Sequence, residues 1–183
     1  MRLFVSADLD GLDSAIADVQ SLFEGADGLR FTDPSQAHVT LKFLGDTDPD
    51  RLDELKAELE RAVEDSGIDA FSADIGGLGV FPSPDYISVV WVGVRRGSEE
   101  LTALHESIES RTTALGFDPE DHDFTPHATV ARMDHAGGKE LVQEVVSERD
   151  PDIGTVEFEE VRLTKSELTP DGPEYSTVES FEL

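Results

Sequence analysis

Two short segments of the chain share a pattern that restricts how it can fold. The segments HVTL at 38–41 and HATV at 127–130 each place a histidine two residues before a threonine in an apolar run. In an extended strand, side chains at positions i and i+2 point to the same face. Each segment therefore predicts a strand that presents an imidazole and a hydroxyl on one face and buries apolar side chains on the other.

The chemistry of such strands depends on whether they meet. Two H-x-T faces brought together would form a symmetric polar cleft containing His38, Thr40, His127 and Thr129. Because the ordinary pKa of histidine is about 6.5, one imidazole can act as a base while the other acts as an acid. The hydroxyls can donate hydrogen bonds to phosphate oxygens. The pattern thus favours metal-free acid–base chemistry on a phosphoester; the alternative is two buried histidines satisfied by neighbouring hydroxyls.

The charge balance gives information about the salt environment of the protein rather than about its ligand. The chain has 41 acidic and 14 basic residues, a formal net charge of −27. The acids are spread along the chain, which is typical of a salt-adapted, halophilic cytoplasmic protein, since salt at 1 M shortens the Debye length to about 3 Å. An acidic protein that binds basic partners would gather its charge in blocks. The composition therefore predicts salt adaptation.

Cysteine and long apolar segments are both missing from the sequence. The lack of cysteine excludes disulfides, thiolate metal sites and a cysteine nucleophile. No segment approaches the roughly 20 apolar residues of a membrane span, and the acidic start does not resemble a signal peptide. We expect a cytoplasmic monomer without membrane contact.

Strands and helices alternate, with antiparallel hairpins among them. The periodicity predicts strands at 2–8, 37–44, 70–80, 86–94, 127–133, 155–165 and 175–182, and helices after residue 11, after Asp48, from a Ser98 cap and near 138–148. Such mixing indicates an α+β protein rather than a doubly wound parallel sheet. With one H-x-T segment in each half, the sequence predicts one domain, 1–183, built as two similar lobes that face each other across a cleft.

Five segments in the same order carry a resemblance to a known family. They are RLFVSADL, HVTLKFLGD, FPSPDYISVVWVGV, FTPHATVAR and LTKSELTPDGPEYSTV. On them the chain resembles the RNA 2′,3′-cyclic phosphodiesterases, also called 2′-5′ RNA ligases, of the two-histidine phosphoesterase superfamily. Two departures are a small Ala128 after the second histidine and Phe31 where many relatives carry tryptophan.

The resemblance implies a fold, a site and a reaction. It implies a bilobal, pseudo-symmetric α+β fold in which two antiparallel-rich sheets face a central cleft, with helices outside. His38, Thr40, His127 and Thr129 would line that cleft, with no cofactor and no metal. The implied substrate is an RNA end bearing a 2′,3′-cyclic phosphate, opened to a 2′-phosphate, with reversible 2′-5′ joining of RNA as a second activity.

Arg132 and Lys42 are further candidates for the cleft. Arg132 matches the arginine that closes the family's second motif and could bind phosphate. Strand alternation gives it the opposite face from His127, so a bulge or the strand's end between Ala131 and Met133 is needed; the alternative is a surface salt bridge. Lys42 shares the predicted face of His38, and a solvent-facing role is the other possibility.

Aromatic and remaining histidine side chains complete the candidates. Phe4, Phe31 and Tyr175 could stack on an RNA base, although most aromatics should be core, and parity assigns Phe43 to the core. His105 lies on the apolar stripe of its helix and is expected to be packed. His122 and His135 lie among Asp121, Asp123 and Asp134; a metal site there is conceivable, but loop histidines beside acids are commoner.

Other functions remain open at this point. The same core would serve a phosphodiesterase for small cyclic nucleotides or an ADP-ribose cyclic phosphate. A non-catalytic nucleotide-binding module would be marked by loss of one histidine, and neither is lost. Because the net charge opposes binding of long RNA, recognition should be confined to the terminal phosphate and one or two nucleotides.

Overall fold

The computed structural model describes residues 1–183 as nine strands and four helices. The strands are β1 (Arg2–Asp8), β2 (Leu29–Phe31), β3 (His38–Asp46), β4 (Phe71–Pro82), β5 (Ile87–Val94), β6 (His127–Met133), β7 (Asp152–Phe158), β8 (Glu160–Thr169) and β9 (Gly172–Glu182). The helices are α1 (Asp13–Ser21), α2 (Leu52–Ser66), α3 (Ser98–Ala114) and α4 (Lys139–Glu148), with short 3-10 turns at Pro34–Gln36 and Pro49–Arg51.

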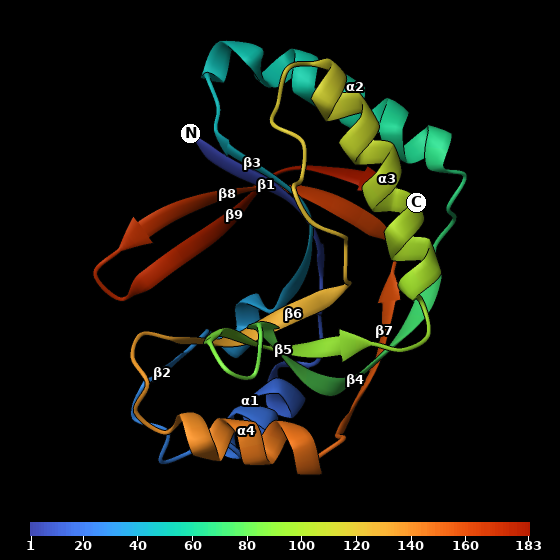
Figure 1. The fold of residues 1–183 in the computed structure, drawn as a ribbon. Helices are drawn as coiled ribbons and strands as arrows, with labels where there is room; N and C mark the ends of the chain where they lie inside the picture. Colours follow the sequence, from blue (N-terminus) through green and yellow to red (C-terminus); the bar gives the residue numbers. More distant parts are fainter.

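The strands form one strongly curled sheet with helices on its outer side (Figure 1). The order is β7-β4-β5-β6-β3-β1-β8-β9, with β2 paired to β6, and neighbouring strands are antiparallel. Helices α2 and α3 pack on β9 and β3, whereas α1 and α4 pack on β6, β7 and β4. The sheet thus divides into two lobes, each with its own pair of helices, as the predicted bilobal α+β fold requires.

The two lobes are connected through a single ladder position. Strands β3 and β6 pair only at Val39 and Ala128, which are both buried. Because opposed residues in an antiparallel ladder share a face, the residues on either side of this pair point to the concave face. The predicted two sheets are therefore the halves of one sheet, joined where the two H-x-T segments meet.

One predicted strand is wrong in a way that matters for the lobes. The segment 155–165 is two strands, because β7 pairs with β4 in one lobe and β8 pairs with β1 in the other. The sequence carries the signal: apolar alternation runs through Val156 and Phe158 and changes phase before Val161 and Leu163. The short strand β2 was also not predicted. The lobes are consequently not the two halves of the chain, since each one contains segments from both.

Helix ends follow local chemistry at one predicted cap and depart from it at another. At the turn before α2, the Asp48 side chain accepts a hydrogen bond from the backbone N–H of Asp50, and Gly67 ends the helix with a φ of 67°. Ser98 does not cap α3 as predicted. Gly97 takes the capping position with a φ of 100°, and the Ser98 hydroxyl donates to the Val94 carbonyl instead.

The core is one connected set of 36 buried apolar residues. It contains residues from both helix pairs, such as Leu59 of α2 and Val142 of α4. No helix combines the length and apolar content that crossing a membrane requires.

Candidate active site

The four residues of the H-x-T segments line one cleft between the lobes. His38, Thr40, His127 and Thr129 all contribute to its wall, and its volume is about 790 Å³. The antiparallel register around Val39 and Ala128 places each histidine nearest to the threonine of the other segment. The predicted meeting of the two motif faces is therefore what the structure shows.

Both imidazoles are held in the same way. The Nδ1 atom of His38 lies 2.8 Å from the Gln36 carbonyl oxygen, and that of His127 lies 2.6 Å from the Thr125 carbonyl oxygen. A carbonyl oxygen only accepts, so each Nδ1 carries a hydrogen and each neutral ring keeps a free lone pair on Nε2. Each supporting carbonyl stands two residues before its histidine. The site therefore presents two equivalent nitrogens that can accept or donate a proton.

A β-bulge interrupts each motif strand three residues after its histidine. In β3 the pairing with β1 passes from Thr40 to Lys42 and leaves Leu41 as the extra residue. In β6 the pairing with β5 passes from Thr129 to Ala131 and leaves Val130 as the extra residue. A bulge reverses the alternation of side chains beyond it. The fifth residue after each histidine therefore returns to the cleft.

Arg132 reaches the cleft by this route. A bulge was expected between Ala131 and Met133, but it lies earlier, at Val130. The arginine lines the cleft and makes no salt bridge. Ten of the 14 basic side chains are ion-paired, and of the four without an acidic partner, Arg132 and Arg2 both line the cleft. In so acidic a chain, unpaired cations at one place indicate a site for an anion.

The bulge at Leu41 overturns two predictions on β3. Lys42 was expected on the face of His38, but it points to the helix side, where its side chain is fully buried and bonded to Glu109. Phe43 was expected in the core, but it is 48% exposed and lines the cleft. Strict alternation fails here because one inserted residue exchanges the two faces of a strand.

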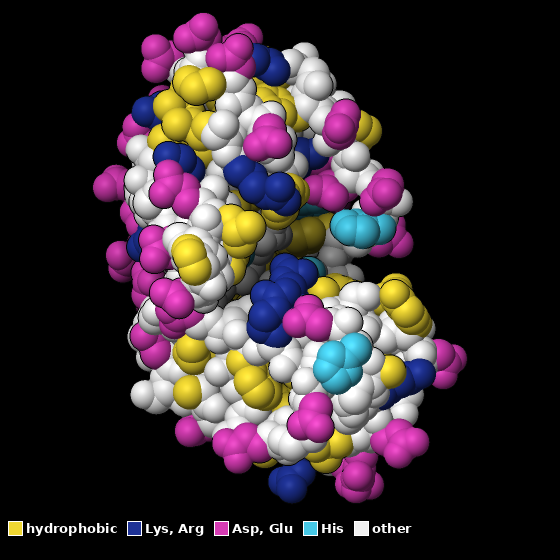
Figure 2. Space-filling model, turned by 90° about the vertical axis from the view of Figure 1, so that its left-hand side faces the viewer, with side chains coloured by type: hydrophobic (Ala, Val, Ile, Leu, Met, Phe, Trp, Pro, Cys, Tyr) yellow, Lys and Arg dark blue, Asp and Glu magenta, His cyan; other side chains and the backbone are white.

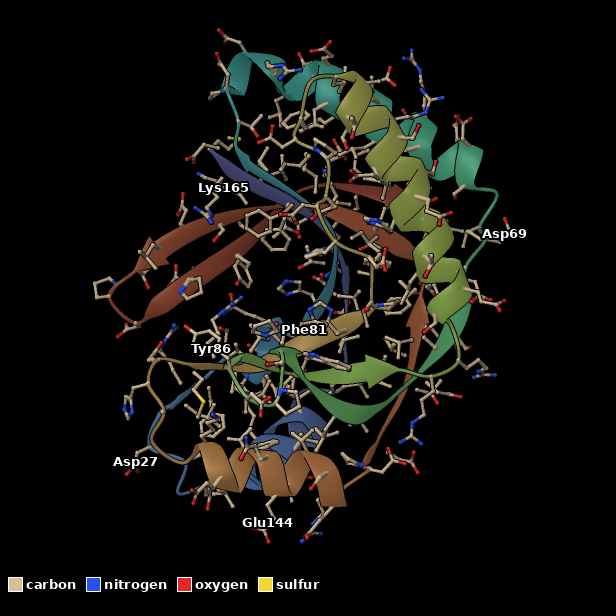
Figure 3. The ribbon with its side chains drawn as sticks, viewed as in Figure 1. Asp27, Asp69, Phe81, Tyr86, Glu144 and Lys165 are labelled. Atoms are coloured by element: carbon tan, nitrogen blue, oxygen red, sulfur yellow. The ribbon has the colours of Figure 1, made fainter.

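Aromatic rings surround both histidines. Phe4 stacks on His38 with centroids 4.9 Å apart, and Tyr175 meets the same ring edge-on at 5.3 Å. On the other side, Phe81 lies 4.9 Å from the His127 ring, and Trp91 lies 5.8 Å from it. Phe81 is placed where the lobes face each other (Figure 3).

The expectation that most of the candidate aromatics would be core holds only for the buried Phe4: Phe31 and Phe43 are exposed, Tyr175 is half-buried, and all four line the cleft. Sequence reasoning missed Phe81 and Trp91, and the register of β4, β5 and β6 brings them to His127. It also missed Arg2 and Arg30, which no motif marked.

The surroundings lower the pKa of both histidines. For His38, burial lowers the pKa and outweighs the opposing effects of the Gln36 carbonyl and the Asp8 carboxylate, and Arg132 lowers it further. For His127, burial lowers the pKa against the effect of the Thr125 carbonyl, and the nearby His38, His122 and Arg132 lower it further. Both rings therefore favour the neutral form more than a free histidine does.

The remaining histidines lie outside this arrangement. His105 is buried as predicted, and its Nδ1 donates to the Leu41 carbonyl at 2.6 Å. His122 lies with Glu120 and Asp121, whose ligand atoms are within 4.8 Å of one another, while the Nδ1 of His135 accepts from the Gly137 N–H instead. The suggested grouping of His122 with His135 is not formed, and the three clustered residues do not line the cleft.

The space-filling view shows how charge is arranged around the cleft. A hollow crosses this face of the molecule, and Lys and Arg side chains lie on both of its sides, while Asp and Glu side chains are scattered among uncharged ones over the rest of the visible surface (Figure 2). The basic residues that line the cleft are Arg2, Arg30 and Arg132. Asp33, Asp171 and Glu174 line the cleft as well, so its charged side chains balance, whereas the chain as a whole is strongly negative.

Two opposed H-x-T strands that hold both imidazoles in one tautomer across a bilobed sheet define the two-histidine phosphoesterase class. A family model described as the 2′-5′ RNA ligase superfamily matches residues 10–169, and the chain belongs to this family. A relative from Methanothermobacter thermautotrophicus, named RNA 2′,3′-cyclic phosphodiesterase, is 37% identical over 100% of this chain and 99% of its own. A relative of the same name from Archaeoglobus fulgidus is 33% identical, with both chains fully covered.

Solved structures agree with the fold. The protein TT0787 of Thermus thermophilus has a TM-score of 0.81 at 26% identity, covering 100% of this chain and 98% of that one. E. coli LigT complexed with 3′-AMP also has a TM-score of 0.81, at 21% identity, covering 100% of this chain and 97% of that one. The family and the bilobal fold expected from the sequence are thus confirmed.

Proposed function

We propose that this protein hydrolyses 2′,3′-cyclic phosphate ends of RNA to 2′-phosphates, with His38 and His127 as the acid–base pair and without a metal. The observation that carries the proposal is the pair of free Nε2 atoms, each fixed by an Nδ1 hydrogen bond and both turned to one cleft. Full-length relatives named RNA 2′,3′-cyclic phosphodiesterase support the same reaction.

The reaction needs one proton accepted and one supplied. A neutral imidazole takes a proton from water while the oxygen of that water forms a bond to phosphorus. The bond between phosphorus and O3′ breaks, and a protonated imidazole gives its proton to O3′. The product keeps the phosphate on O2′, and the two histidines have exchanged protonation states. Each proton transfer of this kind contributes about 10²- to 10⁴-fold to the rate.

Three further residues are assigned to the phosphate. The hydroxyls of Thr40 and Thr129 stand beside the opposite histidines and can donate to the nonbridging oxygens. Arg132, without an acidic partner, can form a charge-assisted hydrogen bond to the same group. The same displacement with the 5′-hydroxyl of a second RNA in place of water, again breaking the bond between phosphorus and O3′, would create a 2′-5′ link, which is the activity named in the family description.

The cleft supports recognition of an RNA end rather than a long duplex. Its volume of about 790 Å³ lies within the roughly 300–1,000 Å³ of small-molecule sites. Asp33, Asp171 and Glu174 share its wall with the arginines, and they would repel phosphates beyond the terminal one. Contacts to one or two nucleotides follow.

We also propose that residues 1–183 act as one two-lobed unit and as a monomer. The continuous core and the shared sheet support one unit, and every residue of the site comes from the same chain. Salt adaptation in a cytoplasmic setting is supported by the 41 acidic residues against 14 basic ones, whose side chains are scattered over the visible surface (Figure 2). We expect the melting temperature to rise from low to molar KCl, because salt screens self-repulsion; a fall would reject salt adaptation.

The test is hydrolysis of a short RNA ending in a 2′,3′-cyclic phosphate, at high salt with a chelator present. Conversion to the 2′-phosphate is the expected result, and a 3′-phosphate product would reject the proposed bond cleavage. The matched control is a nucleoside 2′,3′-cyclic phosphate without the RNA. Turnover of the nucleoside but not of the RNA would move the function to small cyclic nucleotides.

A further inference from the structure

The segment that leads from α3 to His127 is attached to the rest of the molecule by few hydrogen bonds and by no ion pair. Residues 118–126 form no backbone–backbone hydrogen bond. They also make no salt bridge. Yet the Thr125 carbonyl in this segment fixes the ring of His127. The placement of that imidazole therefore depends on what holds residues 118–126.

Two hydrogen bonds tie this segment to the rest of the molecule. The Lys42 Nζ donates to the Asp118 carbonyl oxygen at 2.6 Å, and the Glu120 backbone N–H donates to Glu109 Oε1 at 2.8 Å. The two side chains are joined to each other, because Lys42 Nζ also donates to Glu109 Oε2 at 2.7 Å.

The position of the Lys42–Glu109 ion pair depends on the β-bulge in β3. Lys42 faces the helix side only because the bulge at Leu41 reverses the alternation of β3. The carbonyl of Leu41 accepts a hydrogen bond from His105, and the His105 ring stacks on Phe124 of the segment with centroids 4.1 Å apart. The same bulge thus provides two attachments for the segment that carries the partner histidine's support.

We propose that Lys42 and Glu109 are positioning residues that set His127 against His38 by tethering residues 118–126 to the back of β3. The tether supplements the single ladder pair, Val39 with Ala128, that otherwise joins the two motif strands. Its effect on turnover rests on the proposed function, whereas its effect on the His127 ring does not.

The backbone carbonyl that supports His38 is also held in place by other residues, but through different contacts. The Gln36 carbonyl that supports His38 belongs to a residue whose side chain accepts from the Tyr175 N–H at 3.0 Å and donates to the Pro173 carbonyl at 3.3 Å. Each supporting carbonyl is therefore held by an element distant in sequence. At His127 that element is an ion pair behind the sheet.

The test uses the double variant Lys42→Met/Glu109→Leu. Removing both partners leaves no unpaired charge in the interior, so the fold should survive. We expect kcat on the cyclic-phosphate RNA to fall about 10- to 100-fold with KM changed less than about twofold, because a small misplacement of a reacting group costs rate more than binding. The ¹⁵N signals of His127 should lose the pattern of a hydrogen-bonded Nδ1–H, while those of His38 should keep it.

The matched control is Lys56→Met/Glu179→Leu, which removes another lysine–glutamate pair between a helix and the sheet of the same lobe. It should leave both kcat and the His127 signals unchanged. A merely structural role for Lys42 and Glu109 would lower the melting temperature and leave kcat and the His127 signals intact, and that result would overturn the proposal.

If the double variant does not fold, Lys42→Met/Glu109→Gln provides the same test. It keeps a polar side chain at position 109, leaves no unpaired charge in the interior and removes the ammonium that holds the Asp118 carbonyl oxygen. A His127 ring signal equal to that of the wild type would again overturn the proposal. If the wild type hydrolyses no cyclic phosphate, the proposed function fails, while the ¹⁵N spectra of the variants still decide whether the tether positions the ring.

Discussion

The two H-x-T strands share one geometry but lie in different surroundings. Each has a histidine held through Nδ1 by the carbonyl two residues earlier, and each has a bulge three residues later. Beyond the bulge they differ: β3 turns Phe43 into the cleft and buries Lys42, whereas β6 turns Arg132 into the cleft and buries Ala131. The fold repeats the position of the two histidines, while the residues after the bulge differ between the lobes in charge and in aromatic character.

At the fifth position after the histidine, the difference places a cation on β6 and an aromatic ring on β3. On the side of β6, Arg132 lies in the cleft without an acidic partner and lowers the pKa of both histidines. On the side of β3, Phe43 stacks on Phe4 with centroids 6.2 Å apart, and Arg2 lies 5.3 Å above its ring. A phosphate should therefore be held mainly from the β6 lobe.

The largest effect should come from the histidines themselves. We expect His38→Ala and His127→Ala each to reduce kcat by about 10²- to 10⁴-fold, because each removes one proton-transfer group. The double variant should be little worse than either single variant, since an acid and a base that act in one step work as a unit. Single-turnover hydrolysis of the cyclic-phosphate RNA measures all three.

His38→Asn and His127→Asn separate this effect from misfolding. The asparagine amide can still donate near the position of Nδ1 to the supporting carbonyl, but it has no counterpart of Nε2. These variants should keep the wild-type melting temperature and lose activity as the alanine variants do. Near-normal turnover by either asparagine variant would end the two-histidine mechanism.

The residues five positions after each histidine should respond unequally. Arg132→Gln should lower kcat/KM by about 10- to 100-fold on every cyclic phosphate, since a hydrogen bond to a charged group contributes about 1.5–3 kcal/mol. Phe43→Leu should change it by no more than about tenfold, because a stacked base contributes about 1–3 kcal/mol and leucine keeps part of the apolar contact. Steady-state kinetics with a nucleoside 2′,3′-cyclic phosphate and with a short RNA measure both. Equal losses for the two variants would reject the division between the lobes.

The residues before and after each bulge show how much of the site can be predicted from strand alternation. Period-two alternation places His38 with Thr40 and His127 with Thr129, because each pair lies before the bulge. It fails for Lys42 and Phe43, which lie after it. For Arg132 the resemblance indicated a cleft position that alternation denied, and the conflict itself predicted a bulge. No such conflict marked β3, so the burial of Lys42 could only come from the structure.

The sequence pattern also could not predict which segments of the chain belong to which lobe. Periodicity predicted seven segments that cover eight of the nine strands, because 155–165 merges β7 and β8. Short β2 has only three residues, too few for a period to be read. Strand partners are set by long-range packing, and so the pairing of β7 with β4 and of β8 with β1 could not be read from either segment alone.

The threonines should show smaller and nearly equal effects. Thr40→Val and Thr129→Val keep the branched shape on the strand and remove the hydroxyl donor. We expect kcat/KM to fall about 10-fold for each, near the lower end of what a hydrogen bond to a charged group contributes. The two losses should agree within a few-fold, because the register places each hydroxyl beside the opposite histidine. A large effect at one threonine and none at the other would contradict the pseudo-symmetric binding of the phosphate.

The smallest effect should be a displaced pH optimum. Activity requires one neutral and one protonated imidazole, a state most populated between the two histidine pKa values. Burial is the main cause that lowers both pKa values from 6.5, and Arg132 lowers both of them further, so the maximum of kcat/KM should lie on the acid side of pH 6.5. Above it the acid loses its proton, and below it the base gains one.

Arg132→Gln removes a cation that lowers both pKa values, so the pH optimum of this variant should move to higher pH. Phe43→Leu changes no charge and should leave the optimum in place. Profiles of kcat/KM for the three proteins measure this, and an unmoved optimum in Arg132→Gln would place the arginine too far from the histidines to act on them.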